Sequence, residues 1–282
     1  MALDRQNAKV TTFGLSKPKT NIDRRSCQRT VPMKVLCLGL CRTGTSSLRA
    51  ALFELGLDDV YHMCSVTEEN PLDSKLWKEA FDAKYEGIGK PYGRAEFDAL
   101  LGHCMATSDF PSVAFAPELI AAYPEAKIIL TVRDNADVWY DSVLNTIWRV
   151  SNFLRAPPRT LTQRVVQAIL PKPDFNIFKY SPLGNFPEEG CQWYSDWNEE
   201  IRTLAKGRDF LEFNVKEGWG PLCRFLEVEQ PETPFPRVND SNTFKEFHDK
   251  GLEQDIQRLV GISTKLVAAV GVLGLAVWLA RK

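Results

Sequence analysis

The residues with the clearest chemical meaning stand in one loop, from 39 to 45, which joins an apolar run to a helix-like stretch. Gly39 and Gly44 allow a tight backbone path and leave room for a ligand. Arg42 is the loop's only cation. The apolar run at 35–38 predicts a buried strand. The helix that follows has three candidate N-caps: Thr45, Ser46 and Ser47. Loop amides and a helix N-terminus attract negative charge to one point, so the stretch predicts an anion-binding cradle.

The spacing of the two glycines nearly fits the Walker A pattern of Gly, four residues, Gly, Lys and then Ser or Thr. Gly39, Gly44 and Ser46 fill their places, but Thr45 stands where the Lys is required. That Lys contacts the terminal phosphates in P-loop kinases and GTPases. We therefore interpret the loop as a phosphate or sulfate cradle that lacks the parts for triphosphate hydrolysis. An ordinary turn between a strand and a helix is the alternative.

A second apolar segment ends on a cation. Residues 127–132 form a largely β-branched and apolar run, which predicts a central parallel strand, and Arg133 follows at its carboxyl end. A helix capped by Asn135 or Asp137 is expected next, and it carries Ser142. A Walker B motif would place an Asp directly after the run. Arg133 comes first instead, which again argues against a triphosphate hydrolase.

Two further side chains that could move protons are expected at strand ends. A short strand within 59–63 would place His62 at its carboxyl end. A weak strand that begins near His103 ends at Asp109, because Pro111 cannot continue the hydrogen-bond ladder. Ligands of open parallel sheets bind beyond the carboxyl ends of the strands. His62 and Asp109 are therefore candidate site residues.

The order of the elements predicts an α/β fold, a P-loop-type parallel sheet of about five strands flanked by helices. Residues 209–213 alternate as a late strand, and the Gly- and Pro-rich residues 87–93 are expected as a loop. This domain is expected over residues 34–260. Helices are predicted beyond the two already named in these ranges: 72–83, 112–123, 187–206, 219–226 and 241–259.

Composition excludes several function classes. The chain of 282 residues can form one large α/β domain or two small ones. With 35 Lys and Arg against 36 Asp and Glu, no basic excess favours nucleic acid as a partner. The seven cysteines include no CxxC pair and indicate a reduced intracellular protein. The three histidines show no metal-binding spacing, so we expect no metal in the reaction.

The first 33 residues carry seven basic residues and two acids, without apolar periodicity. This composition predicts a basic, disordered leader over residues 1–33. A mitochondrial targeting peptide is the alternative, although no amphipathic helix is evident.

The other end of the chain is apolar on all sides. Residues 266–280 carry no charge. Counted from Gly261, with Lys265 reaching back to the interface, a helix there spans about 30 Å at about 1.5 Å per residue. We predict a single-pass transmembrane anchor over residues 261–282, with the preceding domain in the cytoplasm. A buried core helix is the alternative.

The segments GLCRTGTSSLRAAL and KIILTVRDNADVWYDSV resemble the two donor-binding segments of the sulfotransferase family. The chain is most similar to the P-loop sulfotransferase branch common in fungi, with its pattern GLxRTGTxSL. Further segments resemble that branch in the same order: DVYHM, TSDFP, VKEGWGPLCRFL and TPFPRVND. The resemblance spans residues 33–245.

The resemblance implies that the co-substrate is 3′-phosphoadenosine 5′-phosphosulfate. It implies that Arg133, with Ser142 on the next helix, holds the 3′-phosphate, for which an Arg fork is suited. A salt bridge from Arg133 to Asp134 or Asp137 is the alternative. The 5′-phosphosulfate would be held by the loop and the first helical turn: Arg42, Thr43, Gly44, Thr45, Ser46 and Ser47.

Two positions depart from the family's pattern. Many members carry Lys where Arg42 stands. Because an Arg pKa exceeds about 12, Arg42 would stabilise the bridging oxygen as a fixed charge without donating a proton. Cytosolic members often have Trp for adenine stacking where Ser47 falls, so the adenine needs another surface here.

The resemblance also addresses the base that takes the acceptor's proton. Cytosolic members carry a His at the place comparable to Asp109. A carboxylate can act as base if burial raises its pKa, so we assign the base to Asp109 and the orienting of the acceptor to His62. His62 competes for the role of base, because its ordinary pKa is near about 6.5. A helix N-cap is the alternative role for Asp109, and a core histidine is the alternative for His62.

The resulting prediction is a membrane-tethered, metal-independent sulfotransferase of secondary metabolism. It would move a sulfuryl group from the phosphoadenosine donor to a hydroxyl of a small, apolar metabolite such as a phenol or alcohol. Two alternatives are a P-loop kinase of a nucleotide or small molecule, which would require magnesium, and a non-catalytic membrane-bound scaffold of the same fold. The acceptor pocket is expected within residues 63–100 and 150–190.

Overall fold

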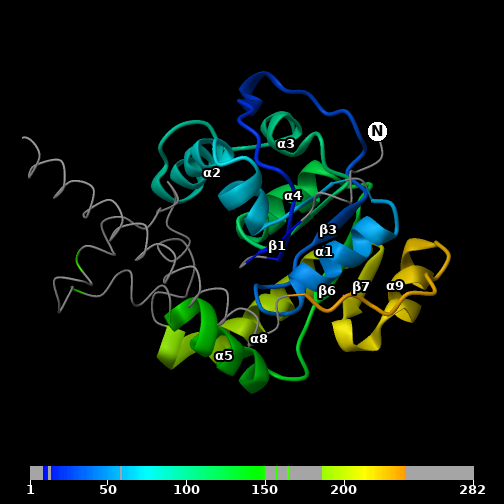
Figure 1. The fold of residues 1–282 in the computed structure, drawn as a ribbon. Helices are drawn as coiled ribbons and strands as arrows, with labels where there is room; N and C mark the ends of the chain where they lie inside the picture. The colour runs from blue at the N-terminus through cyan, green and yellow to red at the C-terminus, as the bar shows by residue number, and fades with distance from the viewer. Residues whose placement is uncertain are drawn as a thin grey trace, which may run out of the picture.

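A five-stranded parallel sheet forms the centre of the computed structural model, in the order β4-β5-β3-β6-β7 (Figure 1). Its strands are β3 (Val35–Cys37), β4 (Val60–Tyr61), β5 (Ala106–Ser108), β6 (Lys127–Thr131) and β7 (Phe210–Phe213). The structure describes residues 9–11, 14–57, 59–149 and 186–238, with the single residues 157 and 164. The expected α/β fold with a helix-flanked parallel sheet is confirmed.

Helices connect these strands. The α-helices are α1 (Thr45–Glu54), α2 (Asp73–Phe81), α3 (Arg94–Leu101), α4 (Ala116–Ala122), α5 (Ala136–Val143), α8 (Phe186–Leu204) and α9 (Trp219–Leu226). Short 3₁₀ turns occur at η2 (Arg24–Ser26), η5 (Ser112–Phe115) and η8 (Val215–Glu217). Turns of π-helix occur at η3 (Ser65–Glu69), η4 (Asp82–Glu86) and η6 (Leu144–Trp148). Near the N-terminus, β1 (Lys9–Thr11) and β2 (Gly14–Ser16) pair as an antiparallel hairpin.

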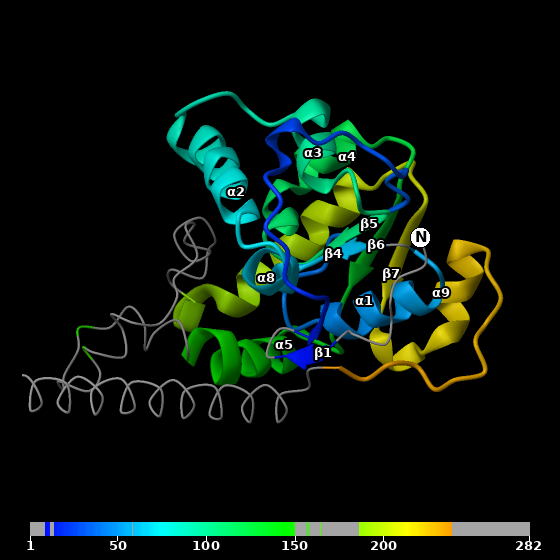
Figure 2. The same cartoon turned by 45° about the horizontal axis from the view of Figure 1, so that its top comes forward.

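Helices cover both faces of the sheet, and successive residues of a strand point to opposite faces. Leu36 and Leu130 belong to the core shared with α2, α3, α4 and α8. Val35 and Ile129 belong to the core shared with α1 and α9 (Figure 2). Strands covered on both faces read as continuous apolar runs, which explains why β3 and β6 stand out in the sequence.

One helix is absent from the sequence-based expectations. The predicted loop over 87–93 leads directly into α3, which buries Phe97 and Leu100. The signal is Glu96 at the third helical position, whose carboxylate accepts a hydrogen bond from the Gly93 amide at 2.9 Å. A residue that closes the helix start in this way marks an N-terminus even where the apolar pattern is short.

Residues 14–33 pack against the domain, which differs from the disordered leader expected there. Arg24 donates to Asp73 at 3.1 Å, and Arg29 is bonded to Asp98. The arginines of this segment therefore find carboxylate partners on α2 and α3, which a reading of composition does not reveal. Residues 1–8 of the expected leader lie outside the described residues.

No helix among the residues that the structure describes is long and apolar enough to cross a membrane. The anchor predicted over 261–282 and the helix predicted over 241–259 both lie outside those residues.

Candidate active site

The strand order brings the predicted site residues to one edge of the sheet. β3 lies between β5 and β6, and β4 lies beyond β5. The loop 38–44, which follows β3, therefore lies between the segments that carry Asp109 and Arg133, while His62 follows the neighbouring β4. All four strands are parallel, so their carboxyl ends share an edge, where ligands of open α/β sheets bind.

Both glycines of the loop are required by close neighbours. A Cβ on Gly39 would lie 1.9 Å from Oγ1 of Thr131 and 2.5 Å from the Thr131 carbonyl oxygen, so the loop passes β6 too closely for any side chain. Gly44 has a φ of 98°, and a Cβ there would lie 2.6 Å from Val215. A side chain at either position would overlap these neighbours, so the tight path that the sequence predicts requires glycine at both.

Side chains from two helices and from the loop itself bind the loop's carbonyl groups. Trp197 of α8 donates to the Leu38 carbonyl at 2.9 Å, and Trp139 of α5 donates to the Cys41 carbonyl at 2.8 Å. The Thr43 hydroxyl donates to the Leu40 carbonyl at 2.6 Å and lies 2.5 Å from the Thr131 hydroxyl. The loop thus directs these carbonyls at protein donors, and the start of α1 supplies the N–H groups that a helix leaves without intrahelical partners.

The sequence analysis did not connect these tryptophans with the loop. Trp139, Trp193 and Tyr194 also form an aromatic cluster, in which Trp139 and Tyr194 stack with 4.9 Å between ring centroids. In the sequence their spacing indicates only an apolar helix face. A buried indole N–H, however, needs a hydrogen-bond acceptor. That requirement is the one sequence signal that could have linked these tryptophans to a backbone carbonyl.

Three predicted donor-site residues meet through Arg42. The Arg42 side chain donates from Nε to the Ser142 hydroxyl at 3.3 Å, so Ser142 contacts Arg42 directly. Arg133 donates from Nε to the Arg42 carbonyl at 2.6 Å, and its own amide donates to the Tyr194 hydroxyl at 2.8 Å. Burial lowers the pKa of Arg133, but a guanidinium remains charged at neutral pH. Two cations therefore lie at one end of the loop.

Asp109, His62 and Thr45 form a hydrogen-bonded group where the loop enters α1. His62 Nε2 lies 3.1 Å from Asp109 Oδ2 and 3.2 Å from Thr45 Oγ1, and Thr45 Oγ1 lies 3.5 Å from the same carboxylate oxygen. The other oxygen, Oδ1, accepts from the Phe110 amide at 2.8 Å. Because Thr45 opens α1, this group adjoins the predicted anion cradle.

Burial sets the protonation of this group. It raises the pKa of Asp109 to about 6, an effect that the Phe110 amide and the Arg42 charge only partly offset. Burial also lowers the pKa of His62 well below its usual value, and the charge of Arg49 acts in the same direction. At neutral pH the pair is therefore a neutral imidazole beside a carboxylate.

The hydrogen bonds of His62 also indicate its tautomer. Nδ1 accepts from the Cys64 amide at 3.4 Å, so the ring proton is on Nε2 and is directed at Asp109. His62 then holds and orients the carboxylate, and Asp109 is the group able to accept a proton near neutral pH.

Two left-handed backbone conformations occur at this site. Arg42 has a φ of 66° and Asp109 a φ of 61°, and neither is glycine. Such conformations cost about 1–3 kcal/mol each and cluster at functional sites. Asp59 and Glu227 adopt the same conformation outside the site, so the positive φ describes the backbone of the loop and of the end of β5 without identifying a function.

The remaining predicted residues differ in their surroundings. Thr43 is fully buried and its hydroxyl is used inside the loop. Ser46 is buried in the first turn of α1. The Ser47 hydroxyl is bonded to the backbone of Val238, accepting from its amide at 3.0 Å and donating to its carbonyl at 3.3 Å.

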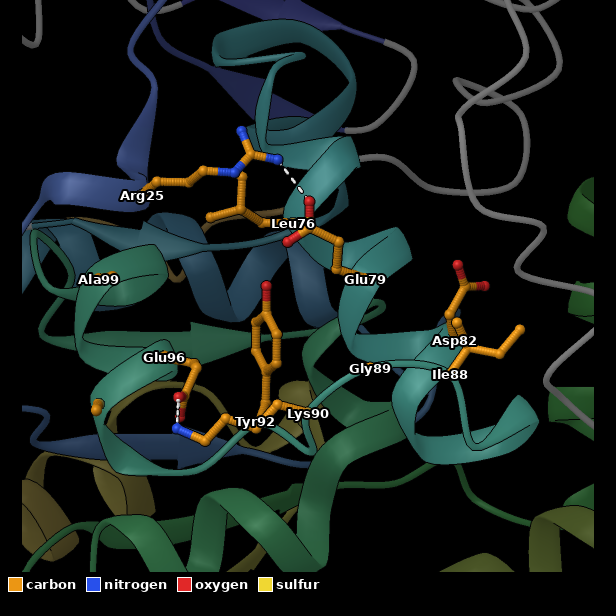
Figure 3. Close-up of a pocket in the computed structure, with 11 residues that line it drawn as sticks. Arg25, Leu76, Glu79, Asp82, Ile88, Gly89, Lys90, Tyr92, Glu96 and Ala99 are labelled. Atoms are coloured by element: carbon orange, nitrogen blue, oxygen red, sulfur yellow. Dashed lines mark hydrogen bonds and ion pairs between the residues drawn. The ribbon is translucent and has the colours of Figure 1, made fainter.

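A cavity of about 550 Å³ lies elsewhere, between α2 and α3 (Figure 3). Tyr92 projects into it, and ion pairs of Arg25 with Glu79 and of Lys90 with Glu96 lie at its sides. It contains none of the predicted catalytic or donor-binding residues, and its lining mixes charges of both signs. Apart from Arg25, its lining residues do fall within the range 63–100 in which the acceptor pocket is expected. The geometry of the sheet edge, not this cavity, therefore defines the candidate active site.

One cluster has ligand types that metals use. Asp59, His103 and Cys104 place one ligand atom each within 4.8 Å of one another. The Lys17 ammonium is bonded to the Asp59 carboxylate, so a cation already balances this charge. None of these residues belongs to the predicted site.

Comparison with known proteins agrees with this geometry. A protein-family model described as "Sulfotransferase domain" matches residues 34–244, which include the loop, both arginines and Asp109. "Ava biosynthesis cluster protein M" of Aspergillus versicolor is 35% identical over 256 residues, which cover 88% of this chain and 97% of that protein. This chain therefore belongs to the sulfotransferase domain family and is a sulfotransferase.

Proposed function

We propose that this sulfotransferase moves a sulfuryl group from 3′-phosphoadenosine 5′-phosphosulfate to a hydroxyl of a small, apolar metabolite, without a metal ion. The observation that carries the proposal is the loop 38–44. Its carbonyls at Leu38, Leu40, Cys41 and Arg42 all accept hydrogen bonds from side chains. A loop with its carbonyls satisfied by protein donors, next to a helix N-terminus and two guanidinium groups, is built for an anion.

The donor's anionic groups have two places to bind. In the proposed complex the phosphosulfate lies on the amides from Arg42 to Ser47, and the 3′-phosphate lies near Arg133 and Ser142. The contact of Arg133 with the Arg42 carbonyl supports this arrangement, because it ties the two regions together. A guanidinium that donates one N–H to a backbone carbonyl keeps further N–H groups for a phosphate.

The transfer itself needs one proton acceptor and one stabilised leaving group. The acceptor hydroxyl oxygen forms a bond to sulfur while the bond from sulfur to the bridging phosphate oxygen breaks, and the electron pair stays on that oxygen. Asp109 takes the hydroxyl proton, since its pKa of about 6 suits a base near neutral pH. Arg42 stabilises the negative charge on the leaving phosphate as a fixed cation and donates no proton.

The surroundings of Asp109 support an apolar acceptor. Phe110 follows it directly and stacks on Phe81 with 5.3 Å between ring centroids, and Phe81 stacks on Tyr85 at 5.9 Å. Tyr85 is exposed, so aromatic rings extend from the surface to the residue beside the proposed base. The similar Aspergillus protein is named for a biosynthesis cluster, and we propose a small biosynthetic metabolite as the acceptor here.

The direct test compares donors by calorimetry on the full-length protein. We expect 3′-phosphoadenosine 5′-phosphate to bind without metal and ATP with magnesium to bind weakly. Arg133→Ala should reduce bisphosphate affinity at least tenfold, since it removes a charge-assisted contact. Arg25→Ala, at an exposed ion pair beside the α2–α3 cavity, is the matched control. ATP preferred with magnesium would replace the proposal with a kinase, and no binding of either nucleotide would favour the scaffold.

A further inference from the structure

Arg49 is a buried arginine that the proposed mechanism does not use. It lies on α1, one helical turn after Thr45, and it is fully buried. Because residues four apart share one face of a helix, Thr45 and Arg49 face the same neighbour. That neighbour is the segment 60–69, which runs from β4 through His62 into η3. A buried guanidinium is costly unless its charge is paired and its N–H groups are bonded, so its partners show what it holds.

Arg49 contacts the chain on both sides of His62. Before His62, its Nε donates to the Val60 carbonyl at 2.8 Å. After His62, its Nη1 is bonded to the Cys64 sulfur, and its Nη2 donates to the Ser65 hydroxyl at 3.4 Å. A guanidinium is planar and presents its donors in a fixed fork. One rigid group therefore spans the turn that carries His62, defined here as residues 60–65.

Residues of this turn connect Arg49 to the His62 ring. The His62 amide donates to the Ser65 hydroxyl at 3.2 Å, and the Ser65 amide donates to the His62 carbonyl at 2.8 Å. The Cys64 amide donates to Nδ1 of the ring at 3.4 Å. The hydrogen bond at one ring nitrogen sets the tautomer of a histidine. The Nε2 proton that is directed at Asp109 therefore depends on where Cys64 and Ser65 lie.

Glu69 balances the charge of Arg49 and fixes its direction. Its Oε1 accepts from Nη2 of Arg49 at 2.8 Å, and both side chains are buried. The same oxygen accepts from the Lys17 amide at 2.7 Å, so a residue of the predicted leader also holds this ion pair in place. A buried ion pair is weak evidence for stability compared with apolar residues, whereas it can specify one arrangement of the chain.

We propose that Arg49 is a positioning residue of the sulfuryl transfer, which holds the turn of His62 so that Nε2 stays directed at Asp109. The inference rests on the proposed function, in which Asp109 is the base. The helix α1 then acts on His62 twice, directly through Thr45 and indirectly through Arg49 one turn later. The effect of Arg49 on the reaction passes through His62 and not through the donor.

Loss of this support should change kcat without changing donor binding. A His62 ring that is free to turn donates to the Asp109 carboxylate only part of the time, so the pKa of Asp109 rises. A rise from about 6 to about 7 lowers the ionised fraction at pH 6 from about one half to about one tenth. We therefore expect kcat to fall about fivefold at pH 6 and hardly at all at pH 8, with the donor KM within about twofold of wild type. Besides Arg49, the titratable and charged groups that act on this pair come from the loop and the turn: Arg42, Cys41 and Cys64.

The test replaces both charges at once. Removing one partner would leave the other buried and unpaired, so Arg49→Met is combined with Glu69→Gln, here called the pair variant. Arg29→Met with Asp98→Asn is the matched control. Arg29 also pairs with a carboxylate and donates to two backbone carbonyls, at 2.9 Å and 3.2 Å, which lie outside the turn of His62.

Two readouts distinguish positioning from a general loss of structure. The chain has three histidines, so imidazole nitrogen spectra can follow each ring, and His62→Gln identifies the His62 signal. Wild type and control should show His62 with its proton on Nε2, and the pair variant should show a mixture of tautomers. Steady-state kinetics at pH 6 and pH 8 give the second readout. Added to His62→Gln, the pair variant should lower kcat less than about twofold further, since both changes act on one contact.

The outcomes separate this inference from the proposed function. An active Asp109→Asn protein would refute the proposed base, and the inference would fall with it. If Asp109→Asn is inactive, the inference alone is refuted by an unchanged His62 signal and pH profile in the pair variant. Equal losses of kcat with and without His62 would also refute it, as would an equal loss in the control. Should the pair variant fail to fold, Ser65→Ala, which removes the hydroxyl between Arg49 and His62, must lower kcat at pH 6 more than at pH 8.

Discussion

The substitution Asp109→Asn tests the base, and it should act on activity and stability in opposite directions. Asparagine retains the shape of the side chain and tolerates the left-handed φ of 61°. It cannot accept the proton of the acceptor hydroxyl. Removing a general base typically costs 10²- to 10⁴-fold in rate, so kcat should fall by that factor, about 2.7–5.4 kcal/mol in barrier.

The stability effect follows from the buried carboxylate. The pKa of Asp109 is raised from 3.8 to about 6 in the folded protein, so the protonated form is the more stable fold. Stability is therefore lost as pH rises from about 4 to about 6. At pH 7 the ionised carboxylate costs up to about 3 kcal/mol, from roughly two pKa units at about 1.4 kcal/mol each. Asp109→Asn removes this cost, so the inactive variant should be more stable than wild type at pH 7 and similar to it near pH 4.

The pH profile of kcat gives an independent readout. With a pKa of about 6, Asp109 is about 90% ionised at pH 7 and about 10% ionised at pH 5, so kcat should fall roughly tenfold between them. With His62→Gln, kcat should still fall at low pH, but the fall should move to higher pH. The reason is that a weaker hydrogen-bond donor to Asp109 stabilises its ionised carboxylate less. Steady-state assays with a phenolic acceptor and chemical denaturation at pH 4 and 7 measure both effects. Asp109→Asn with kcat within tenfold of wild type, beside an inactive His62→Gln, would transfer the role of base to His62.

Three further predictions rest on separate features. Gly39→Ala should lower the free energy of unfolding in denaturant by at least about 3 kcal/mol, because the added Cβ would overlap Thr131. Gly56→Ala is the control: its Cβ would meet no atom within 4 Å, so it should cost only about 1–2 kcal/mol of backbone strain. Arg42→Ala should lower kcat 10²- to 10³-fold with little change in the acid limb, and a rate near wild type would show that this cation does not face the leaving group. Removing residues 261–282 should release the protein from membrane pellets into the supernatant; equal partitioning of both forms would contradict the anchor.

Local patterns accounted for most of the sheet. An apolar run followed by a glycine-bearing loop and a helix lies within about twenty residues, so β3, the loop 38–44 and α1 could be predicted as one unit. The same holds for β6 and the helix after it. The sequence analysis missed α3 because a helix of eight residues shows few repeats of the apolar pattern. Its start is marked by Glu96 instead.

The pairing of site residues required the tertiary structure. The sequence places His62 and Asp109 at two separate strand ends, and only the adjacency of β4 and β5 brings their side chains to 3.1 Å. The family resemblance pairs Ser142 with Arg133 at one phosphate, and the fold adds a contact of Ser142 with Arg42. Sheet order decides such pairs, and no residue spacing encodes it.

What the sequence determined by itself is the family and the local pattern of the site: a glycine-bearing loop without the lysine of a triphosphatase, two arginines that follow strands, and a family resemblance that comparison confirmed. The sequence carries this information locally, because neighbouring residues shape the backbone of a strand, loop and helix. The tertiary structure decided what completes the site. The indoles of Trp139 and Trp197 bind the loop's carbonyls, and Val238 reaches Ser47 across 191 positions. Such contacts depend on which elements the folded core places side by side, and that choice is made by packing over the whole domain.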